Sequence, residues 1–219
     1  LDKCLKNRDF AALNNHGQSI ANRLGLGASP ETSAETFNPV IVDFYEQIGY
    51  LPGALLNYLL LLGWSLDDST EEFSRDEMIQ SFSLEGVNKA AASFDPQKLM
   101  AFQDRAMQQM PLKQRVAKCT GFLQRAGHIC DPPECDTAPK VTQILQAAGD
   151  RVKAAGDILD YADFFTADDV LEYDAKAFEK RIAKPEDAAP LLKEFSTLLA
   201  QLDSFDAASV ETALKSYVE

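Results

Sequence analysis

The chain has 219 residues, of which 46% are hydrophobic and 25% charged, the balance of a folded globular protein that is long enough to bury a core. Its longest apolar stretch, residues 51–64, is interrupted by Pro52, Gly53 and Asn57 and falls short of the roughly 20 residues that cross a bilayer, so we expect no membrane partner. The formal net charge of -13 repels phosphate at long range and, taken alone, argues against a nucleic-acid partner.

Helix start and stop signals divide the first half of the chain. Asn38-Pro39 predicts the start of a helix over residues 40–48 that ends at Gly49. A second helix is expected from Pro52 to Gly63, with a broad buried face that contains Leu55, Leu56, Leu59 and Leu62. Residues 74–77 have the spacing of a capping box.

The same signals continue through the second half. Asp95-Pro96 predicts a helix that breaks at Pro111, and Asp174 predicts the cap of a helix that reaches Ile182. Apolar residues recur at helical spacing in residues 112–127, 141–148, 152–159, 191–202 and 210–218. No segment alternates between apolar and polar residues as a half-buried strand does, so the sequence predicts an all-α fold.

The thiols do not form a recognisable metal site. Cys130 and Cys135 lie close to His128, but with the more distant Cys119 they do not supply four well-spaced ligands, so we expect ordinary thiols beside a proline turn and no metal. Together with Cys4 they are too few and too scattered for a disulfide framework. A reducing cytoplasm, or an organelle matrix, fits this cysteine usage.

No catalytic residue is predicted either. The acidic pairs at residues 67–68, 71–72 and 168–169 stand at expected helix starts, where they cap helices. Gly25-Leu26-Gly27 lacks the third glycine of a dinucleotide fingerprint, and residues 25–35 are predicted to form a linker because they are rich in Gly, Ser, Ala and Thr.

Basic residues gather locally in spite of the acidic total. Lys113, Arg115 and Lys118 fall on one expected helix, and Arg151 and Lys153 on another. Such clusters suit phosphate contacts, and Arg can also stack on a base. On spacing alone, a solvated helix face is the commoner explanation.

Residues 44–65, which read FYEQIGYLPGALLNYLLLLGWS, closely resemble a stretch of bacterial and organellar glutamyl-tRNA synthetases. Residues 82–89, continued by 93–95 and 98–99, resemble the stretch of the same family that leads out of the domain touching the inside corner of tRNA. Residues 150–153, with Asp157 and Phe164-Phe165, resemble a helix of its anticodon-binding bundle. Ala101 and Gln103 stand where the family usually has tryptophan and asparagine.

The resemblance implies two consecutive helical bundles. Residues 1–110 would contact the tRNA stem, with residues 1–37 interpreted as an insertion and linker, and residues 111–219 would bind the anticodon arm and be incomplete at the C-terminal end. The family's histidine-rich ATP motif and lysine-rich loop do not occur in this sequence, so we expect no cofactor here and no glutamate activation. The parent enzyme would join glutamate to tRNA through an adenylate, using ATP and magnesium.

The expected partner is glutamate-accepting tRNA, bound by a monomer, with no DNA partner. The predicted contact residues are Lys89, Lys98, Arg105, Arg115, Lys118, Arg151 and Lys153. A glutaminyl-tRNA synthetase is disfavoured because the anticodon region of that family is built of β-barrels. The alternative is a helical protein-interaction or scaffold module without a nucleic-acid partner; one continuous basic face would favour tRNA, and dispersed cations would favour the scaffold.

Overall fold

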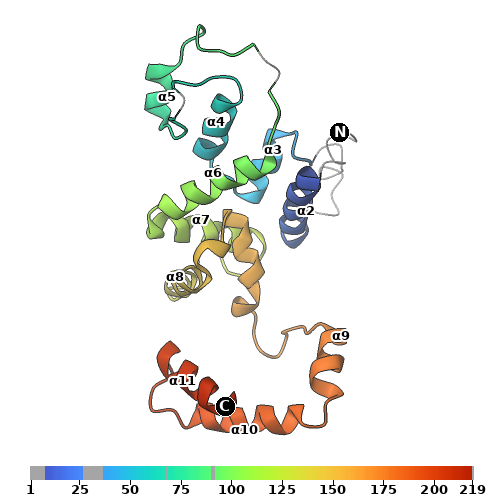
Figure 1. Ribbon diagram of the computed structural model, residues 1–219. Coiled ribbons are helices and arrows are strands. Elements are labelled where there is room, and N and C mark those ends of the chain that lie inside the picture. The colour runs from blue at the N-terminus through green and yellow to red at the C-terminus, as the bar shows by residue number, and fades with distance from the viewer. Residues whose placement is uncertain (1–7, 27–36, 68, 90–91, 219) are drawn as a thin grey trace. The chain divides into compact units, whose positions relative to one another are not determined.

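The computed structural model describes residues 8–26, 37–67, 69–89 and 92–218 (Figure 1). Within these residues the regular structure is helical, and extended pairing is limited to an isolated antiparallel bridge between Trp64 and Val87. The predicted all-α class is confirmed. Most of the predicted linker, and Cys4, lie outside the described residues.

The chain divides into two compact units, Leu1–Thr166 and Ala167–Glu219. The helices of the first unit are α2 (Arg8–Arg23), α3 (Val42–Ile48), α4 (Pro52–Leu61), α5 (Arg75–Ser81), α6 (Pro96–Gln109), α7 (Leu112–Arg125) and α8 (Thr137–Ala148), followed by the 3₁₀ helices η2 (Gly149–Arg151) and η3 (Ala155–Phe165). None of the described helices is both long enough and apolar enough to span a bilayer.

Local capping chemistry sets several helix ends as predicted. Ser74 and Glu77 form the capping box of α5: the Ser74 N–H donates to Glu77 Oε2 at 2.7 Å, and the Glu77 N–H donates to Ser74 Oγ at 3.3 Å. Asp95 caps α6 through the N–H groups of Gln97 and Lys98. Gly49 ends α3 at a φ of 89°, a left-handed conformation that glycine adopts without steric cost.

The predicted start of α3 is wrong. The helix begins at Val42, later than expected, because Asn38 closes a separate turn by accepting the Val40 N–H on Oδ1 at 3.0 Å. The Tyr45 hydroxyl donates to the Pro39 carbonyl at 2.6 Å and holds this turn against the helix.

The predicted buried face of α4 is also wrong. Leu56 is 50% exposed and Leu59 44% exposed, whereas Asn57 and Tyr58 are buried. Asn57 donates from Nδ2 to the Glu71 carbonyl and accepts the Phe73 N–H, and the Tyr58 hydroxyl accepts the Asp95 N–H. These polar bonds orient the helix, which is apolar on nearly every side and therefore has no unique core face by hydrophobicity.

One buried cluster joins most helices of the first unit, whereas α5 contributes no buried residue. It includes side chains from both sides of Pro111, with Leu99 and Met107 of α6 packed in the same core as Leu123 of α7 and Ile158 of η3. Figure 1 shows α6 and α7 near the centre of this unit. The predicted functional division at Pro111 therefore falls inside a shared core, and it stays a prediction.

Gln103 links two segments of this core through hydrogen bonds of its side chain. Its side chain is fully buried, accepts the Leu51 N–H on Oε1 at 2.8 Å and donates from Nε2 to the Lys153 carbonyl at 2.8 Å. The residue that departs from the family's usual asparagine is thus a structural bridge between the start of α4 and the segment before η3.

The second unit contains α9 (Ala175–Phe178), the π-turn η4 (Glu179–Ala183), α10 (Ala188–Ala200) and α11 (Ala207–Val218). The predicted cap Asp174 accepts the Ala177 N–H at 2.6 Å. Tyr217 of α11 packs against Phe195 of α10, with ring centroids 5.2 Å apart and the rings tilted, and donates its hydroxyl to the Leu191 carbonyl. These contacts hold the two helices together, and the core of this unit is small.

Candidate nucleic-acid interface

Lys98 and Arg105 lie on one face of α6, with Phe102 between them. The Lys98 Nζ is 5.9 Å and the Arg105 guanidinium 4.7 Å from the centre of the Phe102 ring. Each also pairs with a carboxylate: Lys98 with Glu71 at 2.8 Å and Arg105 with Glu72 at 2.7 Å. The hydrogen bond from Lys98 lowers the pKa of the Glu71 carboxyl. This cationic pair is therefore largely neutralised by its own neighbours.

Arg115 and Lys118 project from α7. The Arg115 Nη1 donates to Gln108 Oε1 of α6 at 3.2 Å, and Lys118 is exposed. Cys119, next along the helix, is fully buried, and burial raises the pKa of its thiol to about 12. Its sulfur is consequently a packed core thiol and not an available thiolate.

Arg151 and Lys153, which are neighbours in sequence, reach different helices. Arg151 caps the end of α8, donating from Nε to the Ala148 carbonyl at 3.0 Å and from Nη2 to the Ala147 carbonyl at 3.1 Å. The Lys153 ammonium instead lies 3.9 Å from Asp104 Oδ2 of α6. Arg151 thus keeps its charge without a carboxylate partner, whereas that of Lys153 is partly compensated.

Helix α6 is the element that connects most of the predicted contact residues. It carries Lys98 and Arg105, and its Gln108 and Asp104 receive Arg115 and Lys153. In the part of the chain that the structure describes, Lys89 and Lys118 are exposed and pair with no carboxylate. A single continuous basic face stays a prediction.

A buried carboxylate that sequence reasoning left without a role organises the turn before η3. Asp157 Oδ2 accepts the N–H groups of Lys153 and Ala154 at 2.9 and 2.8 Å, and Oδ1 faces His16 Nε2 at 2.5 Å. The hydrogen bond to Asp157 is the main reason that the pKa of His16 is raised. His16 belongs to α2, so a helix from the predicted insertion helps to hold the segment with Lys153.

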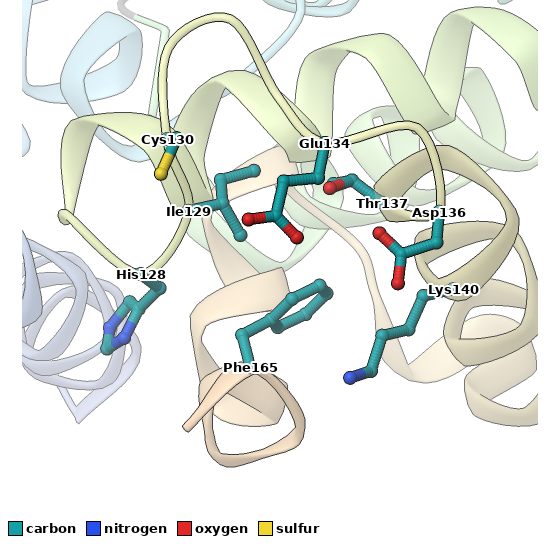
Figure 2. Close-up of a pocket in the computed structure, with 8 residues that line it drawn as sticks. All are labelled: His128, Ile129, Cys130, Glu134, Asp136, Thr137, Lys140 and Phe165. Atoms are coloured by element: carbon teal, nitrogen blue, oxygen red, sulfur yellow. The ribbon is translucent and has the colours of Figure 1, made fainter. Parts of the chain in front are cut away.

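A cavity of about 180 Å³ lies beside the proline turn that contains the exposed thiols (Figure 2). Figure 2 shows the Glu134 and Asp136 carboxylates above the ring of Phe165, with His128 and Lys140 on opposite sides of it. Among the described residues no group of three or more His, Cys, Asp and Glu side chains is arranged to hold a metal ion. The absence of zinc stays a prediction.

Comparisons with known proteins identify the family. Residues 102–219 match the family model described as an anticodon binding domain, and residues 36–101 match the model described as tRNA synthetases class I (E and Q), catalytic domain. A glutamate–tRNA ligase of Moorella thermoacetica is 37% identical over 179 residues, which are 81% of this chain and 36% of the relative. The chain belongs to the glutamyl-tRNA synthetase family.

Further relatives of the glutamyl-tRNA synthetase family agree. A glutamate–tRNA ligase of Herpetosiphon aurantiacus is 30% identical over 88% of this chain and 39% of the relative. The crystal structure of a glutamate tRNA ligase from Elizabethkingia meningosepticum in complex with its amino acid is 29% identical, with a TM-score of 0.63 over 79% of this chain and 32% of that one. The chain spans about a third of the length of the relatives that it matches.

The family assignment confirms the resemblance found in residues 44–65 and does not favour the scaffold alternative. It adds that a part of the catalytic-domain model extends to residue 101, where the anticodon-binding match begins. Gln103 stands at this border and bonds to a residue on each side of it, Leu51 and Lys153. Within the first unit, the region that matches the catalytic-domain model and the region that matches the anticodon-binding model are therefore joined by hydrogen bonds of Gln103.

Proposed function

We propose that this chain is the tRNA-binding portion of a glutamate–tRNA ligase. The match of residues 102–219 to the anticodon binding domain carries the proposal, because Arg115, Lys118, Arg151 and Lys153 all lie within it. The preferred tRNA is a glutamate acceptor, residues 111–219 hold its anticodon arm, and residues 1–110 meet the inner corner. The protein acts as a monomer in the cytoplasm or an organelle matrix.

The complete enzyme attaches glutamate to tRNA with ATP, and magnesium accompanies the nucleotide. The matches to glutamate–tRNA ligases and to a part of the class I catalytic domain support this activity. The chain itself contributes orientation: a bound anticodon arm fixes where the acceptor end lies, and fixing reactants in place lowers a barrier substantially. The bridge through Gln103 supports this role because it links the two matched regions by two hydrogen bonds.

The test is binding of the 219-residue chain to a glutamate-accepting tRNA at roughly 50 to 200 mM salt, a range over which phosphate contacts lose much of their strength. Replacing Arg151 and Lys153 together by alanine should weaken binding by about 1–3 kcal/mol and flatten the salt dependence. The matched control is the double variant K193A/K215A, which removes the same formal charge from exposed positions of α10 and α11 that are not among the predicted contact residues; Lys215 is paired with Glu211.

Folding must be followed in the same experiment. Arg151→Ala also removes two hydrogen bonds to the end of α8, so thermal unfolding is recorded for every variant. Unchanged affinity and salt slope in a folded R151A/K153A variant would remove this pair from the interface and leave Arg115 and Lys118 as the leading contacts. We also expect no ATP-dependent pyrophosphate exchange by this chain alone, and measurable exchange would contradict the assignment.

A further inference from the structure

A chain of hydrogen bonds runs from α2 through η3 and α6 to the start of α4. His16 Nε2 of α2 faces Asp157 Oδ1 of η3 at 2.5 Å, and Asp157 Oδ2 accepts the Lys153 N–H at 2.9 Å. Gln103 Nε2 of α6 donates to the Lys153 carbonyl, and Gln103 Oε1 accepts the Leu51 N–H. The backbone of Lys153 is therefore held at both its N–H and its carbonyl.

Helix α2, which neither matched family model covers, packs closely on the rest of the first unit (Figure 1). A side chain at Gly17 would overlap the ring of Phe44 in α3, and a side chain at Gly156 of η3 would meet the Ile20 side chain. The two glycines thus let α2 lie directly against α3 and η3, on either side of His16. This close packing fixes the place of the imidazole.

Asp157 is the buried junction between the imidazole and the turn before η3. Its side chain is almost fully buried, and Oδ2 also accepts the Ala154 N–H at 2.8 Å. A buried carboxylate is stable only when hydrogen bonds or a cation compensate its charge. Protonated His16 supplies a charge-assisted bond of this kind. The hold of Asp157 on the turn therefore depends on the charge of the imidazole.

His16 can change its charge near neutral pH, and several charged groups act on it. The hydrogen bond to Asp157 raises its pKa, and the charge of Asp160, which also pairs with Arg23 of α2, acts in the same direction. Burial and the Lys153 ammonium oppose this shift. The buried Nδ1 has no hydrogen-bond partner among the described residues, so the polar contact of the ring is made through Nε2.

We propose that His16 is a positioning residue for tRNA binding: through Asp157 it holds the backbone of Lys153, so that a proton bound on α2 strengthens the contact of Arg151 and Lys153 with the tRNA. The inference rests on the proposed function and adds a pH-dependent control to it. His16 acts through the turn and does not itself touch the tRNA.

The pH dependence has a defined direction. Because the pKa of His16 is raised above 6.5, the charged bond to Asp157 is complete below pH 6.5 and is lost as the pH rises through the raised value. A neutral imidazole can still donate from Nε2, but this bond is weaker. We expect the affinity of the unchanged chain for tRNA to fall by about 5-fold between pH 6 and 9, the low end of couplings between two sites.

The first test compares His16→Gln with His128→Ala. The glutamine amide can donate from the place of Nε2 but carries no charge, so H16Q should bind the tRNA with nearly constant affinity from pH 6 to 9, at the level that the unchanged chain reaches at pH 9. His128 is the other of the two histidines, so H128A is the matched control and should keep the pH dependence. The salt slope of H16Q should equal that of the unchanged chain, because no phosphate contact is lost.

A second readout follows the turn itself by NMR of the full chain. In the unchanged chain, the amide signals of Lys153 and Ala154 should titrate with the same midpoint as the His16 ring, because Asp157 links them. In H16Q these amide signals should stay constant over the same pH range. Equal Tm values for H16Q and the unchanged chain at pH 9 would show that the fold is intact.

The outcomes are distinguishable. If the unchanged chain binds the tRNA and H16Q keeps the full pH dependence, His16 is not a positioning residue and the proposed function stands. A constant affinity of H16Q without titration of the two amides in the unchanged chain would mean that the effect does not pass through Asp157, and a lower salt slope would mean that His16 contacts phosphate; either result overturns the positioning role. If the unchanged chain does not bind the tRNA at any pH, the proposed function fails and this proposal fails with it.

Discussion

Replacement of Gln103 should destabilise the first unit more than any exposed substitution on α6. The side chain is fully buried and makes two hydrogen bonds of 2.8 Å, one to the Leu51 N–H and one to the Lys153 carbonyl. Gln103→Ala leaves the buried Leu51 N–H and the partly buried Lys153 carbonyl without this partner. Each such group costs about 1–3 kcal/mol, so the free energy of unfolding should fall by about 2–6 kcal/mol.

A second substitution separates the two contributions to this loss of stability, the unpaired backbone groups and the cavity. Gln103→Met keeps nearly the same volume but cannot accept the Leu51 N–H or donate to the Lys153 carbonyl. It should retain most of the loss, because the unpaired backbone groups outweigh the cavity that Gln103→Ala adds. The control is Gln109→Ala at the exposed end of α6, which should change stability by no more than about 0.5 kcal/mol.

The assay uses the fluorescence of the single tryptophan. Trp64 is buried in the first unit, so urea unfolding followed through it reports on this unit and not on the second. In a unit of this size the expected loss also lowers Tm by roughly 2–4 °C per kcal/mol. A Gln103→Ala protein within 1 kcal/mol of the unchanged chain would refute the bridging role of this residue.

Three further predictions follow from single contacts. Cys119, Cys130 and Cys135 should hold no stoichiometric zinc, and elemental analysis that finds one zinc per chain, lost on chelation together with helicity, would overturn this. Since the pKa of His16 is raised above 6.5, its protonated form stabilises the fold fully below pH 6.5 and this stabilisation is lost as pH rises through the raised value; urea unfolding across pH 6 to 9 should show the decline, and His16→Ala should remove it. Ser74→Ala should destabilise α5 by about 0.5–2 kcal/mol, measured by amide hydrogen exchange of residues 75–81, and unchanged exchange would count against the capping box.

Helix ends could be predicted from the sequence because their chemistry is local. Ser74 with Glu77, Asp95 with the N–H groups that follow it, and Gly49 at positive φ each act within a few residues. The start of α3 was missed because Asn38 serves a turn and not the helix. A capping residue before a proline can begin either a turn or a helix, so this sequence pattern does not show which of them forms.

The orientation of α4 could not be predicted, for a physical reason. Where apolar residues lie on nearly every side of a helix, periodicity gives no preferred face, and the buried face is set by polar partners distant in sequence. Asn57 is held by the backbone of residues 71 and 73, and Tyr58 by that of Asp95. The 3₁₀ path after α8 likewise depends on Asp157, whose partner His16 lies 141 residues away.

The sequence shows which residues of the candidate site carry a cationic side chain, but it does not show which of those charges are compensated in the fold. The sequence gathers Arg151 with Lys153, but folding gives the first a pair of carbonyls and the second a carboxylate of α6. Lys98 likewise meets Glu71, a partner 27 residues away. Nothing in the local sequence separates a paired cation from an unpaired one.

This difference bears on how an acidic chain would bind a polyanion, as the proposed function requires. A cation that must leave a carboxylate gives up part of what it gains from a phosphate, and it exposes that carboxylate to the phosphate as well. Arg151 avoids both losses because carbonyl dipoles orient it without cancelling its charge. Lys118→Ala and Arg151→Ala should therefore each reduce the salt slope of tRNA binding by about one, whereas Lys98→Ala should reduce it less, since Glu71 already compensates Lys98. Equal slopes for all three variants would mean that the ion pairs of α6 open freely on binding, and that the acidic partners do not select which cations contact the tRNA.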